Sequence, residues 1–452
     1  MLESELLTRA DARRIFEEAL RTAHKLGVRE VEVTLSTAAS ALTRFANNAI
    51  HQNVAERRRH VSVRVVMEQR TARASTNRVD EPAAAAAVEQ AATLARARGP
   101  DPEVLPLAED ADIRAIERWC AATAGSTPGT RAAAVAEAIR VVESAGQTAA
   151  GIYSASEGVE AVLNSRGIFA YYADTMAQFS ITAMAEDSSG WAKATSPDVT
   201  RISPLELAER AASKAALSRC PRELPPGRYT VILEPAAAQD LVGQMFWDFS
   251  ATALRDQRSF LNGRLGEKLF GDNITIADDA YHPLQSGPPF DAEGVPRRRL
   301  ALVERGVPRE VAYSRAAAAR EGRTPTGHGF PVPNEFGEAP LNIVMVGGPT
   351  SLEEMIATTE RGVLVTRLWY IREVDPYEKI MTGMTRDGTF LIEGGRLVCG
   401  VRNLRFNQSL IEMLSNVEQL SPAVRAAGEE SFDMVVPALK VRGFNFTEVT
   451  RF

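Results

Sequence analysis

The chain has 452 residues, more than one hydrophobic core usually supports, so we expect two or three domains. Hydrophobic residues make up 45% and charged residues 24%, as in ordinary soluble globular proteins, and no stretch approaches the ~20 apolar residues of a membrane helix. The net charge of -6 argues against a nucleic-acid partner, which normally requires a concentrated basic surface.

The N-terminus and the cysteines favour a cytoplasmic location. Met1–Glu5 is acidic and lacks the basic start and apolar core of a secretory signal. Cys120, Cys220 and Cys399 are far apart and odd in number, which argues against a disulfide framework and fits a reducing compartment.

Helix and strand patterns alternate over residues 1–98, which we assign to an N-terminal α/β domain. Apolar spacing predicts a helix over Ala10–Leu26, and an alanine-rich run predicts another over Ala83–Ala97. Three strand signals lie between them: Val31–Leu35, Leu42–Phe45 and Val61–Val66. The basic run Arg57–His60 is interpreted as a solvated turn, with an anion contact as the alternative.

Residues 99–221 are assigned to a central domain of helix and antiparallel strands. Helices are expected over Arg131–Ala145 and Pro204–Ser218. Three strand segments lie between them: Gln147–Ser154, Val159–Asn164 and Ile168–Ala185. The connections are too short for crossover helices, so the strands should pair antiparallel, and Ser188–Gly190 should end the block.

Residues 222–452 are assigned to the C-terminal domain, because Pro221–Gly227 is the clearest boundary in the chain. A strand at Tyr229–Leu233 precedes a predicted helix at Ala236–Ser250, and strand signals then dominate. Two further helices are predicted: Leu352–Thr358 and Asn407–Val417. The expected fold class is α+β, with a mixed α/β N-terminal region followed by a large, mainly antiparallel β domain.

A search for catalytic patterns finds no zinc helix. The five histidines are never three to five residues apart, and none is followed directly by glutamate: His24, His51, His60, His282 and His328. Asp240, Asp248 and Asp256 recur every eight residues, but at about 100° per residue they do not share a helix face. We therefore interpret these three aspartates as solvated surface.

Polar donors lie beside aromatic residues in three C-terminal segments, Pro325–Gly329, Thr366–Arg372 and Val401–Asn407. Such segments could line a groove that holds an extended peptide through main-chain pairing. The candidate groove residues are His328, Arg367, Tyr370, Asn403 and Arg405. An ordinary polar sheet face is the alternative interpretation.

Several motifs occur in an order that resembles the TldD/PmbA metallopeptidase family. Arg44–Asn53 resembles its N-terminal motif, and Leu163–Gly167 is similar to a later segment. In the C-terminal half Gly266-Glu267, Phe290–Pro296 and Thr382-Gly383 match in order and context. The resemblance runs nearly end to end, and it points to the PmbA type of subunit, also called TldE.

The resemblance implies a two-domain subunit that assembles with a relative, in bacteria as a heterodimer around a proteolytic chamber. TldD-type members carry His-Glu-x-x-x-His on the helix after the first C-terminal strand, with a later cysteine as third zinc ligand, and PmbA-type members lack these ligands. At the matching positions this chain has Gln239, Asp240 and Gln244. A neutral amide is a poor zinc ligand, and the segment Gly428–Pro437 supplies no cysteine.

We therefore expect no catalytic residue and no metal in this chain. The leading hypothesis is a non-catalytic TldE-like subunit whose TldD-type partner holds zinc and cuts unfolded or small peptides. One alternative keeps activity here through a displaced metal site using His328, Asp291 or Cys399. Another is a peptide-binding homo-oligomer without proteolytic activity. In a regular α-helix Gln239 and Gln244 would diverge by about 140°, so their convergence would require a π-bulge or another distortion.

Overall fold

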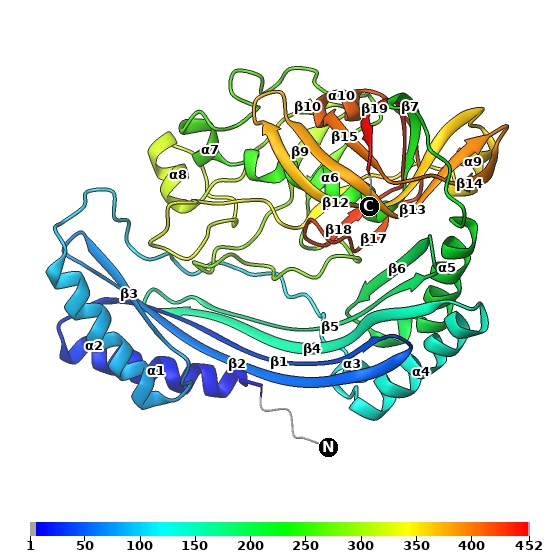
Figure 1. The fold of residues 1–452 in the computed structure, drawn as a ribbon. Helices are drawn as coiled ribbons and strands as arrows, with labels where there is room; N and C mark the ends of the chain where they lie inside the picture. Colours follow the sequence, from blue (N-terminus) through cyan, green and yellow to red (C-terminus); the bar gives the residue numbers. More distant parts are fainter. Residues whose placement is uncertain (1–5, 451–452) are drawn as a thin grey trace.

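The computed structural model describes residues 6–450 and confirms the α+β class. Strands hold 39% of the residues and helices 25%, so the sheets determine the architecture. A long curved N-terminal sheet forms a cradle, and the C-terminal half of the chain lies on its concave side (Figure 1). That half combines a β-barrel with a second, mixed sheet, as the expectation of a large β domain requires.

The N-terminal sheet is antiparallel and has the strand order β3-β2-β1-β4-β5-β6. Its strands are β1 (Glu30–Ala46), β2 (Ala49–Met67), β3 (Arg70–Thr76), β4 (Thr148–Asn164), β5 (Phe169–Met184) and β6 (Ser189–Ser196). β1 and β4 pair from Glu32↔Asn164 to Phe45↔Gly151. One continuous sheet therefore crosses from the first to the second of the predicted units.

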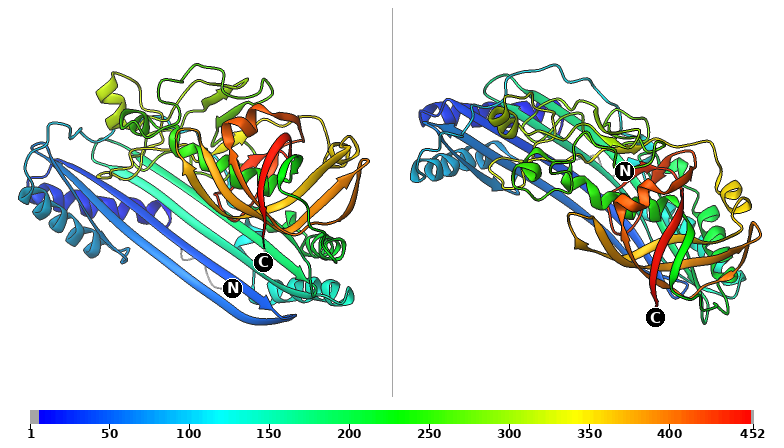
Figure 2. Two further views of the ribbon diagram at one scale, coloured as in Figure 1. Left: turned by 45° about the horizontal axis from the view of Figure 1, so that its top comes forward. Right: turned by 90° about the horizontal axis from the view of Figure 1, so that it is seen from above.

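Helices cover the convex face of this sheet at its two ends (Figure 2). They are α1 (Arg9–Lys25), α2 (Glu81–Ala97), α3 (Ala121–Ala124), α4 (Pro128–Ser144) and α5 (Pro204–Leu217), with a 3-10 turn η1 (Val199–Arg201) before α5. α1 and α2 bury one apolar cluster against β1, β2 and β4, and α4 and α5 bury a second one against β4, β5 and β6. Among residues 6–450, the part of this face between the two clusters carries the short helix α3.

Four local expectations for this sheet are wrong. Gln147–Ser154 and Val159–Asn164 are not separate strands, because β4 spans both. The two predicted strands at Val31–Leu35 and Leu42–Phe45 form one strand, because β2 and β4 pair with β1 on both sides of the weak strand formers between them. Arg57–His60 lies within β2 and is not a turn, since it pairs with Ser36–Ala39. Ser188–Gly190 does not end the sheet: β6 starts at Ser189, and Gly190 lets it lie directly against α5.

The C-terminal barrel has the strand order β12-β7-β19-β15-β13, closed by pairing of β12 with β13. Its strands are β7 (Gly227–Leu233), β12 (Arg361–Asp375), β13 (Ile380–Glu393), β15 (Leu404–Ser409) and β19 (Leu439–Val449), extended by β14 (Arg396–Gly400) and β16 (Val417–Leu420). The second sheet comprises β8 (Ile276–Asp278), β9 (Leu300–Glu304), β10 (Val307–Pro308), β11 (Ile343–Met345), β17 (Val424–Ala426) and β18 (Met434–Val436).

The helices of this half are short. They are α6 (Pro235–Val242), α7 (Ala251–Arg255), α8 (Arg315–Glu321), α9 (Leu352–Ala357) and α10 (Leu410–Ser415), with the 3-10 segment η2 (Gly243–Asp248) after α6. The predicted helices at 236–250 and 407–417 are therefore too long. In residues 6–450 no helix is long and apolar enough to cross a membrane.

A buried ionic network joins the N-terminal sheet to the C-terminal half. On the sheet, Arg73 contacts Glu32 at 2.6 Å, and Arg64 lies 3.8 Å from Glu32. Arg64 also reaches across to Glu293 at 3.2 Å, and Arg315 contacts the same Glu293 oxygen at 2.9 Å. Because Glu32, Arg64 and Glu293 are each at most 3% exposed, the network fixes how the two halves meet.

Candidate functional site

Gln239 and Asp240 lie on α6, directly after the barrel strand β7, and Gln244 lies at the start of η2. α6 packs against β12 and against β17 and β18 of the second sheet. Gln239 and Asp240 have no exposed surface, and Gln244 is half-buried. All three side chains contact residues 428–432, the loop between β17 and β18, which we call the 428–432 loop.

Asp240 accepts hydrogen bonds from two backbone amides of this loop. Its Oδ1 atom lies 2.9 Å from the amide nitrogen of Glu430 and 3.1 Å from that of Glu429, and its Oδ2 atom is 3.3 Å from the latter. The carboxyl group therefore satisfies two partly buried backbone donors of the loop.

The two glutamines hold the loop through its carbonyl groups. Gln239 Nε2 donates to the carbonyl oxygen of Phe432 at 2.8 Å and lies 3.5 Å from that of Ser431. Gln244 Nε2 donates to the carbonyl oxygens of Glu430 and Asp240, both at 3.1 Å. The backbone changes from α to 3-10 geometry at Gly243, so the helix is distorted here, and the glutamines contact successive loop residues rather than one point.

Two glycines allow the close approach of helix and loop. A Cβ atom on Gly428 would lie 2.1 Å from Oδ1 of Asp240, and one on Gly243 would lie 1.9 Å from Oγ of Ser431. Neither position tolerates a side chain without displacing the loop.

The loop is also held from two other directions. Glu430 accepts hydrogen bonds from the amides of Tyr370 and Ile371 in β12, both at 3.1 Å. Lys193 of β6 donates to the carbonyl oxygen of Gly428 at 2.8 Å and contacts Glu429 at 3.1 Å. The loop thus connects α6, the barrel and the N-terminal sheet.

Burial raises the pKa of Asp240 to about 7, against an ordinary value of 3.8. The amides of Glu430 and Glu429 oppose this shift, whereas the carboxylates of the same residues reinforce it. Between about pH 4 and pH 7 the folded protein therefore keeps a proton on Asp240 that the unfolded chain has lost.

We expect this proton to make stability depend on pH. Because the folded state binds the extra proton, the contribution of Asp240 to the free energy of unfolding should fall as pH rises from about 4 to about 7, by up to about 4 kcal/mol. Asp240→Asn, which resembles the protonated acid, should remove this slope. Urea unfolding of both proteins across that range measures it, and parallel profiles would contradict the assignment.

The donor set at α6 does not fit a zinc ion. Both amide nitrogens donate to loop carbonyls, and the Asp240 oxygens accept from loop amides, so the side chains are aligned with a peptide segment. Oε1 of Gln239 is buried without a hydrogen-bond partner, but one neutral amide oxygen does not make a zinc site.

The interpretation of the three spaced aspartates as solvated surface is wrong for two of them. Asp240 is fully buried, and Asp248 is 5% exposed with its carboxylate 2.5 Å from Lys379. Asp256 is exposed, as expected, and pairs with Arg255 and Arg258. Helix periodicity separated these residues correctly, but it does not indicate which faces are covered.

The five candidate groove residues do not form one open surface. His328 is 1% exposed, with Nε2 at 3.0 Å from Asp278 and Nδ1 at 2.9 Å from Thr326, so its side chain belongs to the interior. Arg367 is 8% exposed, pairs with Asp387 at 2.5 Å and stacks on Trp191 of the N-terminal sheet. Its role is a contact between the two halves.

The remaining three candidates are accessible. Tyr370 is 49% exposed, has φ of 57° at a bulge in β12 and stacks with Arg372. Asn403 and Arg405 are half-buried at the start of β15, and Arg405 pairs with Met384 of β13. Of these, only Tyr370 touches the 428–432 loop.

The residues named for a displaced metal site have other contacts. Asp291 accepts from the amides of Glu293, Val295 and Gly329 at 2.9–3.0 Å. Cys399 is half-buried in β14, beside Leu391 of β13. In residues 6–450 no three His, Cys, Asp or Glu side chains are grouped so that they could hold a metal.

Three segments of the chain match the three domains of one protein family, in the same order. Its residues 31–95, 80–219 and 226–448 match, in turn, domain 1, the central domain and the C-terminal domain of the PmbA/TldA metallopeptidases. The first two matches fall on the shared N-terminal sheet with its helices, and the third covers the barrel and the second sheet.

Individual relatives and a solved structure agree with this family match. The metalloprotease PmbA of Escherichia coli O157:H7 is 24% identical over 458 aligned positions, covering 95% of this chain and 97% of that protein. An uncharacterised protein of Methanocaldococcus jannaschii is 33% identical over 179, which is 38% of this chain and 41% of that protein's length. The crystal structure of TldE from Thermococcus kodakarensis has the same fold, with a TM-score of 0.86, 22% identity and coverage of 96% and 100%. The chain therefore belongs to the PmbA/TldD metallopeptidase family.

Proposed function

We propose that this chain is a non-catalytic subunit of the PmbA/TldE type. The observation that carries the proposal is the 428–432 loop, which hydrogen-bonds all three side chains at the positions of the family's zinc helix. In this proposal α6 has a structural role, because its polar side chains bind the chain's own backbone. Another chain carries out the metal chemistry.

The partner in this proposal is a TldD-type subunit with an intact His-Glu-x-x-x-His helix, and zinc is its cofactor. The near full-length match to a metalloprotease PmbA and the TldE fold support this choice. The substrate is an unfolded or small peptide, and the accessible residues Tyr370, Asn403 and Arg405 are candidates for contacting it. Three unpaired cysteines agree with a cytoplasmic assembly.

Co-expression with a TldD-type subunit from the same organism tests the proposal. We expect the two chains to co-purify and the mixture to cleave an unstructured peptide, whereas the isolated chain should show no hydrolysis above background. The matched control is the same mixture in which the partner's Glu is replaced by Gln, which should assemble but not cleave.

Two results would contradict the proposal. Stoichiometric zinc and chelator-sensitive hydrolysis by the isolated chain would favour a displaced metal site. A stable homo-oligomer that binds peptide and ignores the TldD-type subunit would favour a binding protein without proteolytic function.

A further inference from the structure

β2 exposes an unusually long free edge at the rim of the N-terminal sheet (Figure 1). Ala49–His60 pairs with β1 on one side, but β3 pairs with β2 only from Val61 onward. In residues 6–450 no strand pairs with Ala49–His60 on its other side, and every residue from His51 to His60 is exposed. Twelve residues at about 3.4 Å each give an edge of roughly 40 Å.

The other end of the sheet is protected. β6 packs against α5 and touches β13 and β17 of the C-terminal half. Exposed edge strands carry unpaired backbone donors and acceptors and tend to pair with another chain unless something blocks them. In residues 6–450 two edges at this end of the sheet could accept a strand, and the edge of β2 is longer than the outer edge of β3, which has 7 residues.

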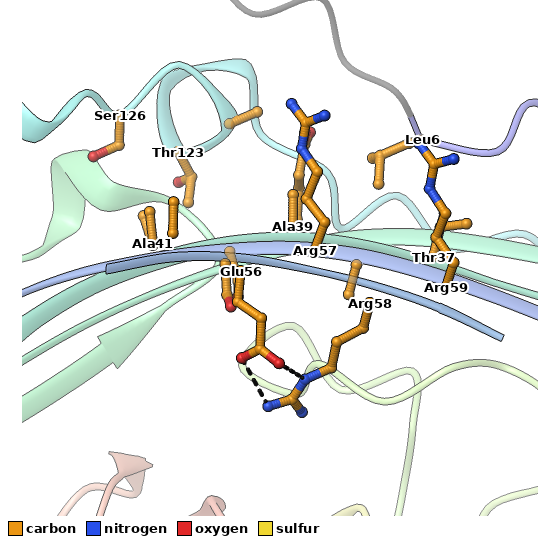
Figure 3. Close-up of a pocket in the computed structure, with 17 residues that line it drawn as sticks. Leu6, Thr37, Ala39, Ala41, Glu56, Arg57, Arg58, Arg59, Thr123 and Ser126 are labelled. Atoms are coloured by element: carbon orange, nitrogen blue, oxygen red, sulfur yellow. Dashed lines mark hydrogen bonds and ion pairs between the residues drawn. The ribbon is translucent and has the colours of Figure 1, made fainter. Parts of the chain in front are cut away.

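The charge along this edge is positive on the helix-covered face of the sheet and balanced on the opposite face. Arg57 and Arg59 project from the helix-covered face, whereas Arg58 and Glu56 project from the opposite face (Figure 3). Arg58 forms an ion pair with Glu56 at 2.8 Å, and Arg57 and Arg59 make interactions of their own. With three arginines and one glutamate, Ala49–His60 has a formal charge of +2, counting histidine as neutral.

Small side chains leave room beside this edge. On the helix-covered face a cavity of about 170 Å³ is bounded by Arg57 and Arg59 and by alanines of three neighbouring strands, Ala39, Ala41, Ala55 and Ala155. Thr123 and Ala124 of α3 and the following Ser126 also line this cavity, so side chains of an added strand that point to this face would meet a shallow, partly polar pocket beside that short helix.

We propose that the Ala49–His60 edge is the docking strand for an acidic β-strand of the partner subunit. Backbone pairing would supply affinity, and the arginines would select the partner. Because Arg57 and Arg59 lie on one face and Glu56 balances Arg58 on the other, the complementary strand should carry acidic residues at alternate positions. A second copy of this chain fits less well, since full antiparallel overlap of two such edges places Arg57, Arg58 and Arg59 opposite Gln52, His51 and Ile50 and gives them no carboxylate. The inference rests on the proposed function, because it names how the TldD-type partner attaches.

Hydrogen exchange of the complex with the co-expressed TldD-type subunit tests the backbone pairing. Amides in Ala49–His60 should exchange at least about tenfold more slowly in the complex than in the free chain. The triple variant Arg57→Glu/Arg58→Glu/Arg59→Glu should raise the Kd by about tenfold or more at low salt, with a smaller effect at high salt. The corresponding glutamine variant should lie between it and the wild type.

The matched control is Arg140→Glu/Arg201→Glu/Arg210→Glu, which makes the same charge change at exposed positions on α4, η1 and α5. It should bind as the wild type does. If the wild-type complex forms with unchanged exchange at Ala49–His60, or if charge reversal leaves the Kd unchanged, the inference fails while the proposed function stands. If the charge-reversal variant self-associates but binds the TldD-type subunit normally, the inference also fails, because the arginines then serve only to prevent self-pairing of the edge. Absence of any wild-type complex overturns both.

Discussion

Replacing Asp240 by alanine is expected to lower the free energy of unfolding by about 2–5 kcal/mol near pH 5.5, where the carboxyl group is protonated. The substitution removes the Asp240 acceptor from the partly buried amides of Glu429 and Glu430 and opens a void at a fully buried position. Chemical denaturation measures the loss. Amide exchange in the 428–432 loop should accelerate at the same time, because the loop loses its attachment to α6.

Asp240→Asn is the control for this result. Its amide oxygen can replace Oδ1, the atom that receives both loop amides, so the loss should stay below about 1 kcal/mol at the same pH. Asn keeps both the volume and an acceptor oxygen, so equal losses for the two variants would contradict the assignment of the loss to the void and the hydrogen bonds to the loop.

Replacing Arg64 by alanine is expected to cost about 3–5 kcal/mol, because it leaves the buried carboxylate of Glu293 with one cation fewer and removes a charge beside Glu32. Arg315 still contacts Glu293 and Arg73 still contacts Glu32, so each half keeps its own pair while the link between them is lost. We expect the two halves to unfold less cooperatively, which differential scanning calorimetry would reveal as a broadened or split transition.

Arg140→Ala is a suitable comparison, because Arg140 is 70% exposed and lies 3.8 Å from Glu137 on the surface of α4. Its loss should change stability by no more than about 0.5 kcal/mol. If Arg64→Ala behaves like this exposed variant, the ionic network does not hold the two halves together.

The contact between the 428–432 loop and α6 bears on the resemblance to the zinc-binding members of the family. The sequence assigns the absent cysteine to the stretch beginning at Gly428, and the structure brings that stretch onto α6. A metal joining these two segments would fix their distance through coordination, whereas here Asp240, Gln239 and Gln244 fix it through hydrogen bonds to the backbone. In the proposed subunit, hydrogen bonds therefore hold the 428–432 loop against α6, the role that a zinc ion would have in a TldD-type subunit.

Local sequence patterns predicted the elements whose stability is mainly local. The helix expected at Ala10–Leu26 is α1 at Arg9–Lys25, and that at Pro204–Ser218 is α5 at Pro204–Leu217, because capping residues and apolar spacing define both. The same patterns failed at Arg57–His60, where pairing with β1 overrides a charged sequence that alone suggests a turn. They also failed at His328, whose glycine-rich neighbours gave no sign of its buried partner Asp278.

The sequence by itself predicted that Gln239, Asp240 and Gln244 stand on a helix after the first C-terminal strand. It also showed that two of the three side chains are neutral amides, which are poor zinc ligands, so that Asp240 alone cannot hold the ion. Only the tertiary structure decided what those side chains bind. Asp240 and Glu429 are 189 residues apart in the chain, and no periodicity or spacing connects them. The contact exists because β17 and β18 bring their connecting loop against α6, and because Gly428 and Gly243 have no side chain to keep it away.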